Sequence, residues 1–376
     1  MDFSLHIISF DIPFPANYGG VIDVYYKIRA LHLAGIKIHL HCFEYQRQPA
    51  PELEVLCESV HYYPRKTGLM SNLSLKPYIV CSRMSHELLE NLLHDDYPIL
   101  FEGLHTCGFI NDKRLNGRLL IYRESNIEHH YYYHMFAAEK NIVKKFFFLT
   151  ESFRLKLFQS VLKHASLMLT VSHEDTAYLK KAFPHKEVIY LPSFHGHDEP
   201  CILTGRGKYA LYQGKLSVAE NSLAAEFLII KVWEGSFPEL VVAGLDPPPW
   251  LKKLAGSRQN IRLIENPSDE EMLRLIQQAH INILVTFQPT GLKLKLLNAL
   301  FNGRFCLVNP FMVTGTSLGN LCIQATSPDD FKSAIPAIFQ QDFSRVLISE
   351  RKTVLLKNYS DKKNCKRLVE MLTLPA

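Results

Sequence analysis

Two absences bear on where this chain of 376 residues works. No run of apolar residues approaches the roughly 20 that a membrane-spanning helix requires. The first residues, MDFSLHIISFDIPF, carry no positively charged region, and they reach Asp11 and Pro13 too early for a secretory signal peptide. We therefore expect a cytoplasmic protein.

The cysteines lack the spacing of a disulfide framework or a thiolate metal site. None of the eight forms a CxxC pair, and most lie in apolar, strand-like segments. We expect reduced, buried thiols, as is usual for a cytoplasmic protein. The eight positions are Cys42, Cys57, Cys81, Cys107, Cys201, Cys306, Cys322 and Cys365.

The chain carries only a modest excess of positive charge. The net charge is +5, and no basic tract or nucleic-acid-binding motif accompanies it, so we expect no nucleic acid as partner. A modest positive charge suits anionic substrates. A hydrophobic content of 47% with 21% charged residues excludes a disordered or fibrous chain.

Signatures for metals and common cofactors are also missing. There is no Asp-x-Asp motif, and no group of histidines, cysteines and carboxylates has the spacing of metal ligands. The loop from Asp11 to Gly20 follows an apolar run but lacks G-x-G-x-x-G, the fingerprint of nicotinamide and flavin sites. We predict no metal and no bound cofactor.

What the first half contains is an alternation of strands and helices. Leu5–Phe10 is predicted to be a buried strand, residues 21–34 a helix that ends at Gly35, and Ile36–Phe43 the next strand. Such a βαβ unit implies a parallel, doubly wound sheet. Further strands are expected at Ser59–Tyr63, Ile99–Phe101, Leu119–Arg123, Leu167–Val171 and Val188–Leu191.

A second alternating series follows Pro192–Lys208, a proline-, glycine- and polar-rich segment that we interpret as a linker. With about 150 residues per domain, two domains are expected, over 1–193 and 205–355. The second series contains predicted helices at 222–230, Trp250–Ala255 and Asp269–Ala279. Its strands are predicted at Tyr209–Gln213, Glu239–Gly244, Ile261–Ile264 and Ile281–Val285.

The segment from Thr290 to Val308, TGLKLKLLNALFNGRFCLV, combines a glycine, two lysines and a helical pattern. Gly291 precedes the helix, so unpaired backbone N–H groups and the positive end of the helix dipole would lie near Lys293 and Lys295. This combination suits a phosphate or diphosphate. The alternative is a solvated lysine face on an ordinary core helix. A helix stop at Gly303 and a further strand, Arg304–Val308, follow.

Residues 291–300, GLKLKLLNAL, resemble the nucleotide-sugar loop and helix of the family-4 retaining glycosyltransferases, a branch of which carries Gly-x-Lys-x-Lys-x-x-Glu-Ala. The resemblance implies that Lys295 binds the donor diphosphate. It also implies a ribose-binding role for Asn298, which replaces the glutamate of that pattern. An asparagine hydrogen-bonds hydroxyls but carries no charge.

Two further segments resemble segments of the same family, and a third is a candidate because it is a glycine-containing loop after a predicted strand. Pro15–Gly20 is similar to its Pro-x-x-x-Gly-Gly segment, in which Gly19 and Gly20 would let a phosphate or sugar approach the backbone. Gly214 and Lys215 match a glycine turn with a cation, and Glu220-Asn221 matches a Pro-Asn pair at the asparagine alone. In Met312–Ser317, Thr314 is a candidate to complete a diphosphate nest. Ordinary turns would have the same composition.

Two residues near strand ends are candidates for catalysis together with Lys295. His105 follows the strand at 99–101, where the family has a histidine that hydrogen-bonds the donor sugar; the alternative is a structural histidine. Asn126-Ile127-Glu128 fits an Asn-x-Glu segment that lines the family's cleft. Glu128 would bind an acceptor hydroxyl, or would pair with Arg123 or a histidine.

Taken together, the resemblance implies an α/β protein with two Rossmann-like domains facing across a cleft, the GT-B type. The donor nucleotide sugar would bind the second domain and a glycan or lipid-linked acceptor the first, and a closing helix, 356–376, would return to the first domain. It also implies retention of anomeric configuration and a role in surface-glycan assembly. The alternatives are a nucleotide-sugar epimerase or hydrolase on the same fold, and a non-catalytic nucleotide-sugar-binding subunit, which Asn298 and Glu220 favour.

The cluster Lys144-Lys145-Phe146-Phe147-Phe148 lies in a helical stretch, Ile142–His164. Such a surface could rest on an anionic membrane, which would make the protein peripheral to the inner face. Because the phenylalanines run consecutively rather than along one face, we expect them instead to pack against the sheet or a partner subunit.

Overall fold

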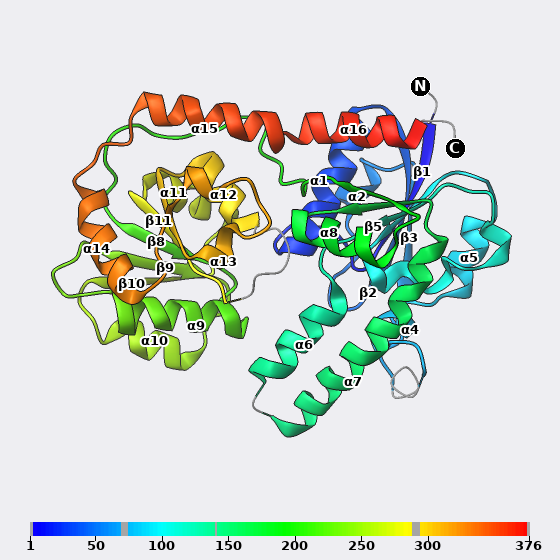
Figure 1. The fold of residues 1–376 in the computed structure, drawn as a ribbon, viewed down its shortest axis with the longest axis horizontal. Coiled ribbons are helices and arrows are strands. Elements are labelled where there is room, and N and C mark those ends of the chain that lie inside the picture. The colour runs from blue at the N-terminus through cyan, green and yellow to red at the C-terminus, as the bar shows by residue number, and fades with distance from the viewer. Residues whose placement is uncertain (1–2, 69–73, 140, 288–293, 374–376) are drawn as a thin grey trace. The chain divides into compact units, whose positions relative to one another are not determined.

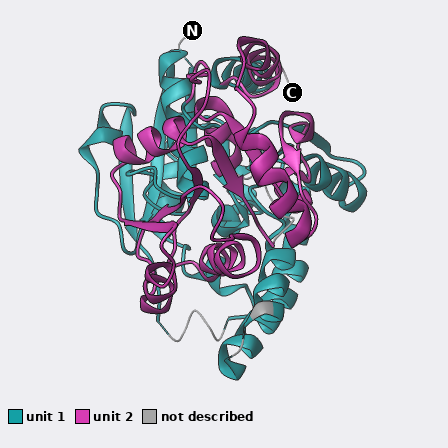
Figure 2. Cartoon of the chain, turned by 90° about the vertical axis from the view of Figure 1, so that its left-hand side faces the viewer, with its two compact units in different colours: residues 1–196, 290–292, 361–376 teal, residues 197–289, 293–360 magenta. Residues whose placement is uncertain are grey.

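Residues 3–68, 74–139, 141–287 and 294–373 are described in the computed structural model, and they fall into two α/β units (Figure 1). The first unit contains the chain up to Gly196 and again from Asp361 onward. The second lies between His197 and Ser360 (Figure 2). Each unit is built around its own parallel sheet.

The sheet of the first unit has seven parallel strands in the order β3-β2-β1-β4-β5-β6-β7. Every strand predicted in this half is present, within two residues of the predicted bounds. The strands are β1 Phe3–Ser9, β2 Ile36–Glu44, β3 Ser59–Pro64, β4 Ile99–Glu102, β5 Leu120–Arg123, β6 Leu167–Thr170 and β7 Glu187–Tyr190.

Helices cover both faces of this sheet. α1 (Gly19–Leu33) ends before Gly35, whose φ of 80° is the left-handed conformation that glycine adopts without strain. The other helices of the unit are α2 Pro51–Glu54, α4 Tyr78–Cys81, α5 His86–Leu92, α6 Glu128–Ala138, α7 Ile142–Phe158, α8 His173–Ala182 and the short 3-10 helices η1 Leu104–Phe109, η2 Lys113–Leu115 and η3 Gln159–His164.

The C-terminal helix α16 (Asp361–Thr373) packs on the first unit. Its buried residues Leu368 and Leu372 join the core cluster that contains Val24, Ile28 and Leu31 of α1. The structure thus returns the end of the chain to the first sheet.

The sheet of the second unit has six parallel strands in the order β10-β9-β8-β11-β12-β13. The predicted strands are confirmed, and only β13, which is two residues long, goes beyond the prediction. The strands are β8 Ala210–Gln213, β9 Leu240–Gly244, β10 Ile261–Glu265, β11 Ile281–Leu284, β12 Phe305–Val308 and β13 Ile323–Gln324.

The helices of the second unit agree less closely with the sequence pattern. The helix predicted at 222–230 begins three residues earlier, and the predicted loop 312–317 includes the end of the short helix α13. Pro336 lies inside α14, and the pattern therefore does not predict that helix. The elements are α9 Ala219–Phe227, η4 Leu228–Val232, α10 Pro249–Gly256, α11 Asp269–Gln278, α12 Leu294–Asn302, α13 Pro310–Val313, η5 Gly319–Leu321, α14 Pro328–Phe339 and α15 Arg345–Asn358.

The eight cysteines are all free, and the expectation of buried thiols is correct for some of them only. Cys42, Cys107, Cys306 and Cys365 are buried, whereas Cys201 is exposed because it lies in the polar segment after the first unit. Among the described residues, no helix has both the length and the apolar character needed to cross a bilayer.

Both sheets have a point where the strand order reverses, between β1 and β4 and between β8 and β11. In open parallel sheets, ligands bind beyond the carboxyl ends of the strands at such points. The chain segments that leave β1, β4, β8 and β11 are therefore where each unit's site is to be sought.

Candidate functional site

In the second unit, the turn after β8 brings two backbone segments close together. The Cβ of any larger residue at Gly244, the last residue of β9, would lie 1.8 Å from the carbonyl oxygen of Gly214. A Cβ on Gly214 would in turn lie 3.1 Å from the Asn221 side chain. Gly244 thus needs glycine for the close approach of the neighbouring backbone, whereas a side chain at Gly214 would require only a small shift of Asn221. The motif at Gly214 does not reveal the requirement at Gly244.

Asn221, at the N-terminal end of α9, holds this turn in place. The Asn221 side-chain amide donates to the backbone carbonyl of Lys215 at 3.0 Å, and the backbone carbonyl of Asn221 accepts from the Tyr212 hydroxyl at 2.9 Å. The Lys215 side chain is exposed beside this arrangement. A polar turn with one exposed cation therefore lies at the carboxyl end of β8.

Lys295 reaches the same turn from the first residues of α12. Its ammonium lies 3.3 Å from the Asn221 side-chain oxygen and 5.6 Å from the centre of the Tyr212 ring. The structure thus gathers Gly214, Lys215 and Lys295, which are far apart in sequence, at the point where the strand order reverses. Their roles toward a ligand stay a prediction.

The other donor-site candidates have different surroundings. Asn298 accepts a hydrogen bond at its side-chain oxygen from the Asn302 amide, at 2.9 Å along the same helix. The Thr314 hydroxyl donates to the Pro310 carbonyl of its own short helix at 3.1 Å. Gly291 and Lys293 lie outside the described residues.

A carboxylate that the sequence motifs do not single out as a ligand also occupies this strand end. Glu220 accepts a hydrogen bond from the Thr286 hydroxyl, directly after β11. The Asn309 side chain fixes the backbone of Thr286 by accepting from its N–H at 3.1 Å and donating to its carbonyl at 2.7 Å. Only the strand order places Glu220 beside Thr286, and therefore local sequence carries no signal for this contact.

In the first unit, the two candidates for catalysis lie close together. The Nδ1 atom of His105 lies 3.8 Å from a carboxylate oxygen of Glu128, and the His105 ring contacts the Phe10 ring at 5.2 Å between centres. Gly103 makes room for the imidazole: its φ is 74°, and a Cβ there would lie 2.9 Å from Nδ1. Glu128 thus lies beside a histidine, but the two side chains are too far apart for a hydrogen bond, and His105 Nδ1 is buried without a hydrogen-bond partner among the described residues.

Burial sets the protonation of this pair. It lowers the pKa of His105 well below its usual range, and the guanidinium groups of Arg83 and Arg65 lower it further. Burial raises the pKa of Glu128 to about 8, against the opposing effect of Arg83. At neutral pH the pair is therefore a neutral imidazole beside a carboxylic acid, which together offer hydrogen bonds without net charge.

The positive charge near this pair comes from Arg83, which the sequence motifs do not indicate. Its guanidinium donates to the carbonyls of Phe10 at 2.6 Å and Ile79 at 2.8 Å. Burial lowers its pKa to about 10, so it stays protonated at neutral pH. Nearby, Arg65 donates to the Ser82 hydroxyl at 3.1 Å. Neither arginine forms an ion pair with a carboxylate in the described part of the chain.

The two glycines at the start of α1 have different surroundings. A Cβ on Gly20 would lie 2.5 Å from the Phe10 ring, so the close neighbour that requires glycine there is this ring. Gly19 has no other atom within 4 Å of its hypothetical Cβ among the described residues. Arg47 holds the preceding loop by donating to the carbonyls of Ile12 at 2.9 Å and Pro15 at 2.8 Å. Contact of either glycine with a ligand stays a prediction.

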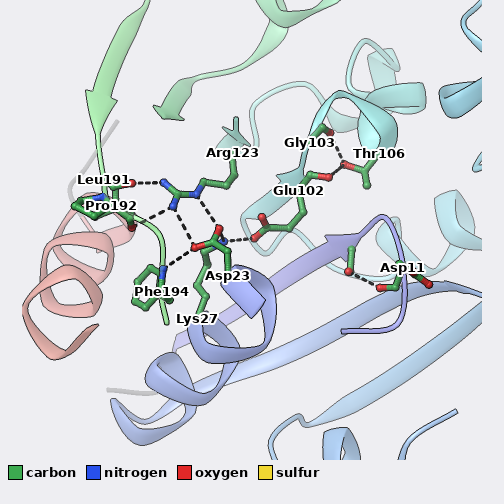
Figure 3. A network of polar contacts seen from close by, with 11 residues as sticks. Asp11, Asp23, Lys27, Glu102, Gly103, Thr106, Arg123, Leu191, Pro192 and Phe194 are labelled. Carbon is green, nitrogen blue, oxygen red and sulfur yellow. Dashed lines mark hydrogen bonds and ion pairs between the residues drawn. The ribbon is translucent and has the colours of Figure 1, made fainter. Parts of the chain in front are cut away.

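A buried network of four charged side chains joins α1 to the ends of two strands of the first sheet (Figure 3). Lys27 donates to Asp23 at 3.0 Å and to Glu102 at 2.6 Å, while Arg123 lies 3.3 Å from Asp23. Burial opposes ionisation of Asp23, but Arg123 and Lys27 outweigh it and lower its pKa to about 2. Arg123 therefore belongs to this network, and the alternative of an Arg123–Glu128 pair is wrong.

The same network also holds the backbone that follows β7. Arg123 donates to the carbonyls of Leu191 at 2.6 Å and Pro192 at 3.1 Å, and Asp23 accepts from the N–H of Phe194 at 2.7 Å. Glu102, its fourth member, immediately precedes Gly103 and His105. The network thus anchors the end of β4, the end of β5 and the segment after β7 to α1.

No group of three or more histidines, cysteines, aspartates and glutamates within the described ranges is arranged to hold a metal ion. Each unit thus has its own candidate site. That of the second unit consists of cations, amides and hydroxyls, and that of the first unit contains a neutral histidine and a carboxylic acid. Both lie beyond the carboxyl ends of parallel strands.

Two Rossmann-like units, each built on a parallel sheet, define the two-domain GT-B fold, as predicted. Comparison with solved structures agrees. Sucrose-phosphate synthase from Thermosynechococcus elongatus superimposes with a TM-score of 0.70 at 12% identity over 98% of both chains. HepE from Anabaena, in complex with UDP-glucose, gives 0.66 at 10% identity over 98% of this chain and 99% of its own.

Sequence comparison is less informative. No family model matches the chain. A Klebsiella pneumoniae protein, described as an uncharacterized 44.6 kDa protein in the cps region, is 24% identical over 342 residues, which cover 84% of this chain and 83% of that protein. TarM, whose structure matches with a TM-score of 0.69 over 100% of this chain and 99% of its own, is only 8% identical.

Proposed function

We propose that the protein is a glycosyltransferase that moves a sugar from a nucleotide-sugar donor to a glycan or lipid-linked acceptor. The observation that carries this proposal is the convergence of Lys295, Asn221 and the Gly214 turn at the strand-order reversal of the second sheet. The fold supports it, and so does HepE, which binds UDP-glucose on the same fold.

In this proposal the second unit binds the nucleoside diphosphate. Lys295 and Lys215 are placed to attract its phosphates, and charge that develops on the leaving diphosphate would be stabilised by the same groups. Asn298 would hydrogen-bond the ribose. Gly291, Lys293 and Thr314 would complete the phosphate site with backbone N–H groups, an ammonium and a hydroxyl.

The first unit would bind the reacting sugar and the acceptor. The neutral imidazole of His105 would hydrogen-bond a donor-sugar hydroxyl, and Glu128 would hydrogen-bond an acceptor hydroxyl. Gly19 and Gly20 would line the same region. Their position beyond β1, β4 and β5 supports this assignment.

The finer features of the reaction belong to the proposal as well. The anomeric configuration would be retained, with the leaving phosphate accepting the proton of the acceptor hydroxyl, and no metal or cofactor would take part. The protein would work in the cytoplasm, in peripheral contact with the inner face of the membrane. The match to a protein of a cps region supports a role in surface-polysaccharide biosynthesis.

Calorimetric titration with UDP, GDP and ADP tests donor binding and identifies the base. Lys295→Ala should weaken binding of the preferred nucleotide at least about tenfold, since a hydrogen bond to a charged group contributes roughly 1.5–3 kcal/mol. The control is Lys252→Ala, because Lys252 is an exposed lysine of the same unit that pairs with Glu265. Equal affinities for the two variants would refute the phosphate role of Lys295.

Asn298 favours one alternative, a nucleotide-sugar-binding subunit without transferase activity. The family pattern has an acidic residue at this position, whereas the Asn298 amide is uncharged and accepts a hydrogen bond from Asn302. If this alternative holds, Asn298→Glu should gain transferase activity from an inactive parent. An active wild type that loses activity in the same variant contradicts it. An epimerase or hydrolase would instead convert the nucleotide sugar without an acceptor.

A further inference from the structure

Helix α7 exposes an unusual amount of apolar surface. Phe146 and Phe153 each leave more than 60% of their surface exposed, at 69% and 63%. Scattered exposed apolar residues are common, but a contiguous set marks an interaction site. The exposed set on this helix, called the α7 stripe below, is Ile142, Val143, Phe146, Leu149, Phe153 and Leu157.

The spacing of these residues makes one continuous stripe. From Ile142 to Leu157, five of them recur at intervals of three and four residues, which places them within about 80° of the helix circumference. Of the three consecutive phenylalanines, Phe147 and Phe148 contact Tyr78 and Tyr132 of neighbouring helices, whereas Phe146 is exposed. The expected packing against the sheet or a partner subunit is therefore not what the structure shows for Phe146 within this chain.

The opposite face of α7 already has its partners within the first unit. The Phe148 ring contacts the Tyr132 ring of α6 at 6.0 Å, and the Ser152 hydroxyl donates to the His129 carbonyl at 2.7 Å. Leu155 is fully buried. The stripe is thus not needed to hold the hairpin of α6 and α7, which projects from the first sheet in Figure 1.

The charge on α7 is almost entirely positive. Lys145 and Lys156 flank the stripe on one side, and neither forms an ion pair with a carboxylate in the part of the chain that is described. Lys156 is exposed, and Lys145 is half-buried with its ammonium 5.0 Å from the centre of the Phe136 ring. The only acidic residue of the helix, Glu151, is fully buried, where it accepts from the Tyr78 N–H at 2.7 Å and pairs with Arg154 at 2.9 Å. The exposed surface of the helix therefore carries aromatic, aliphatic and cationic groups.

We infer that the α7 stripe is a docking surface for an anionic lipid bilayer. The inference rests on the proposed function for its peripheral membrane contact and names the residues that make it. Apolar side chains would insert at the boundary of headgroups and acyl chains, while the flanking lysines lie among anionic headgroups. A second copy of the chain fits less well, because pairing two α7 stripes would bring like-charged lysines together.

Sedimentation with vesicles tests this directly. Wild-type protein should bind vesicles of phosphatidylcholine and phosphatidylglycerol in equal parts, and bind less to pure phosphatidylcholine or at high salt. The double variant Phe146→Glu/Phe153→Glu should bind at least about tenfold more weakly. The matched control is Leu33→Glu/Val55→Glu, which changes two isolated exposed residues of the same unit and should bind like wild type.

A second variant and two further measurements complete the test. Lys145→Glu/Lys156→Glu should lose the preference for anionic vesicles. Nucleotide titration and thermal melting of each variant should match wild type, which separates a failure here from a failure of the proposed function. Wild type that does not bind vesicles, or a Phe146→Glu/Phe153→Glu variant that binds unchanged, overturns the inference. It is equally overturned by a wild-type dimer that this variant dissociates without any vesicle binding.

Discussion

At the scale of single residues, the site of the first unit depends on how burial changes two acid–base equilibria. Glu128 is protonated at neutral pH because its surroundings exclude water, not because another carboxylate lies in hydrogen-bond contact. His105 is neutral for the same reason, with Arg83 adding to the effect. A pair without net charge avoids the cost of an unpaired buried ion.

Glu128 therefore gives stability a defined pH dependence. Its pKa is about 8 in the folded protein, against 4.5 for an ordinary glutamate such as that of the unfolded chain. The contribution of Glu128 to the free energy of unfolding is therefore complete below pH 4.5 and is lost as the pH rises to 8. Glu128→Gln, which cannot ionise, should lose on the order of 2–4 kcal/mol less free energy of unfolding than wild type between about pH 5 and 8.

Urea unfolding at several pH values across this range measures the difference. His164→Gln, a change at an exposed position of the same unit, serves as control and should follow wild type. Parallel pH profiles for wild type and Glu128→Gln would mean that Glu128 is already ionised in the folded protein.

The residue scale is also where prediction from the sequence reaches its limit. His105, Glu128 and Lys295 stand out because they follow predicted strands or lie in a motif. Arg83 and the contact between Glu220 and Thr286 do not, because both depend on which strand ends are neighbours in the sheet. Sheet order is non-local information that no short pattern contains.

At the scale of elements, three strands of the first sheet are joined by a chain of hydrogen bonds between side chains. Asp95 contacts His6 of β1 at 2.9 Å, His6 contacts His41 of β2 at 2.9 Å, and His41 contacts Tyr63 of β3 at 2.8 Å. Asn91 of α5 donates to the Tyr63 hydroxyl at 2.9 Å. This chain replaces apolar packing on part of one sheet face, so it must stay fully hydrogen-bonded to be tolerated.

The hydrogen bonds through His6 should make the stability of the first unit sensitive to acid. Burial lowers the pKa of His6 from 6.5 to about 4, although Asp95 partly opposes this. Its contribution is present above pH 6.5 and is lost as the pH falls toward 4, because the unfolded chain binds the proton first. His6→Gln should therefore lose on the order of 1–2 kcal/mol less stability than wild type between about pH 6.5 and 5.

Denaturant unfolding at these two pH values checks the expectation. His32→Gln is the control, because His32 is an exposed residue at the end of α1. An identical loss of stability in wild type and His6→Gln would contradict the prediction, because it would mean that His6 has the same pKa in the folded and unfolded protein.

At the scale of the whole molecule, the alternation of apolar runs and amphipathic segments was sufficient to predict two doubly wound sheets. Buried parallel strands are continuous apolar runs, which are conspicuous in sequence. The elements that go beyond the prediction have physical reasons: β13 is too short to form a run, and Pro336 interrupts the pattern of α14.

Distant parts of the first unit meet at one aromatic side chain, Phe10. Its ring fills the space that Gly20 leaves open and lies tilted against the His105 ring, and its carbonyl accepts a hydrogen bond from Arg83. An inactive Gly20 mutant would consequently be ambiguous to a geneticist, since a displaced phenylalanine would disturb the imidazole even if no sugar ever touched that glycine. Gly19 has open space around it, so a substitution there that abolishes activity would be evidence that the substrate contacts this glycine.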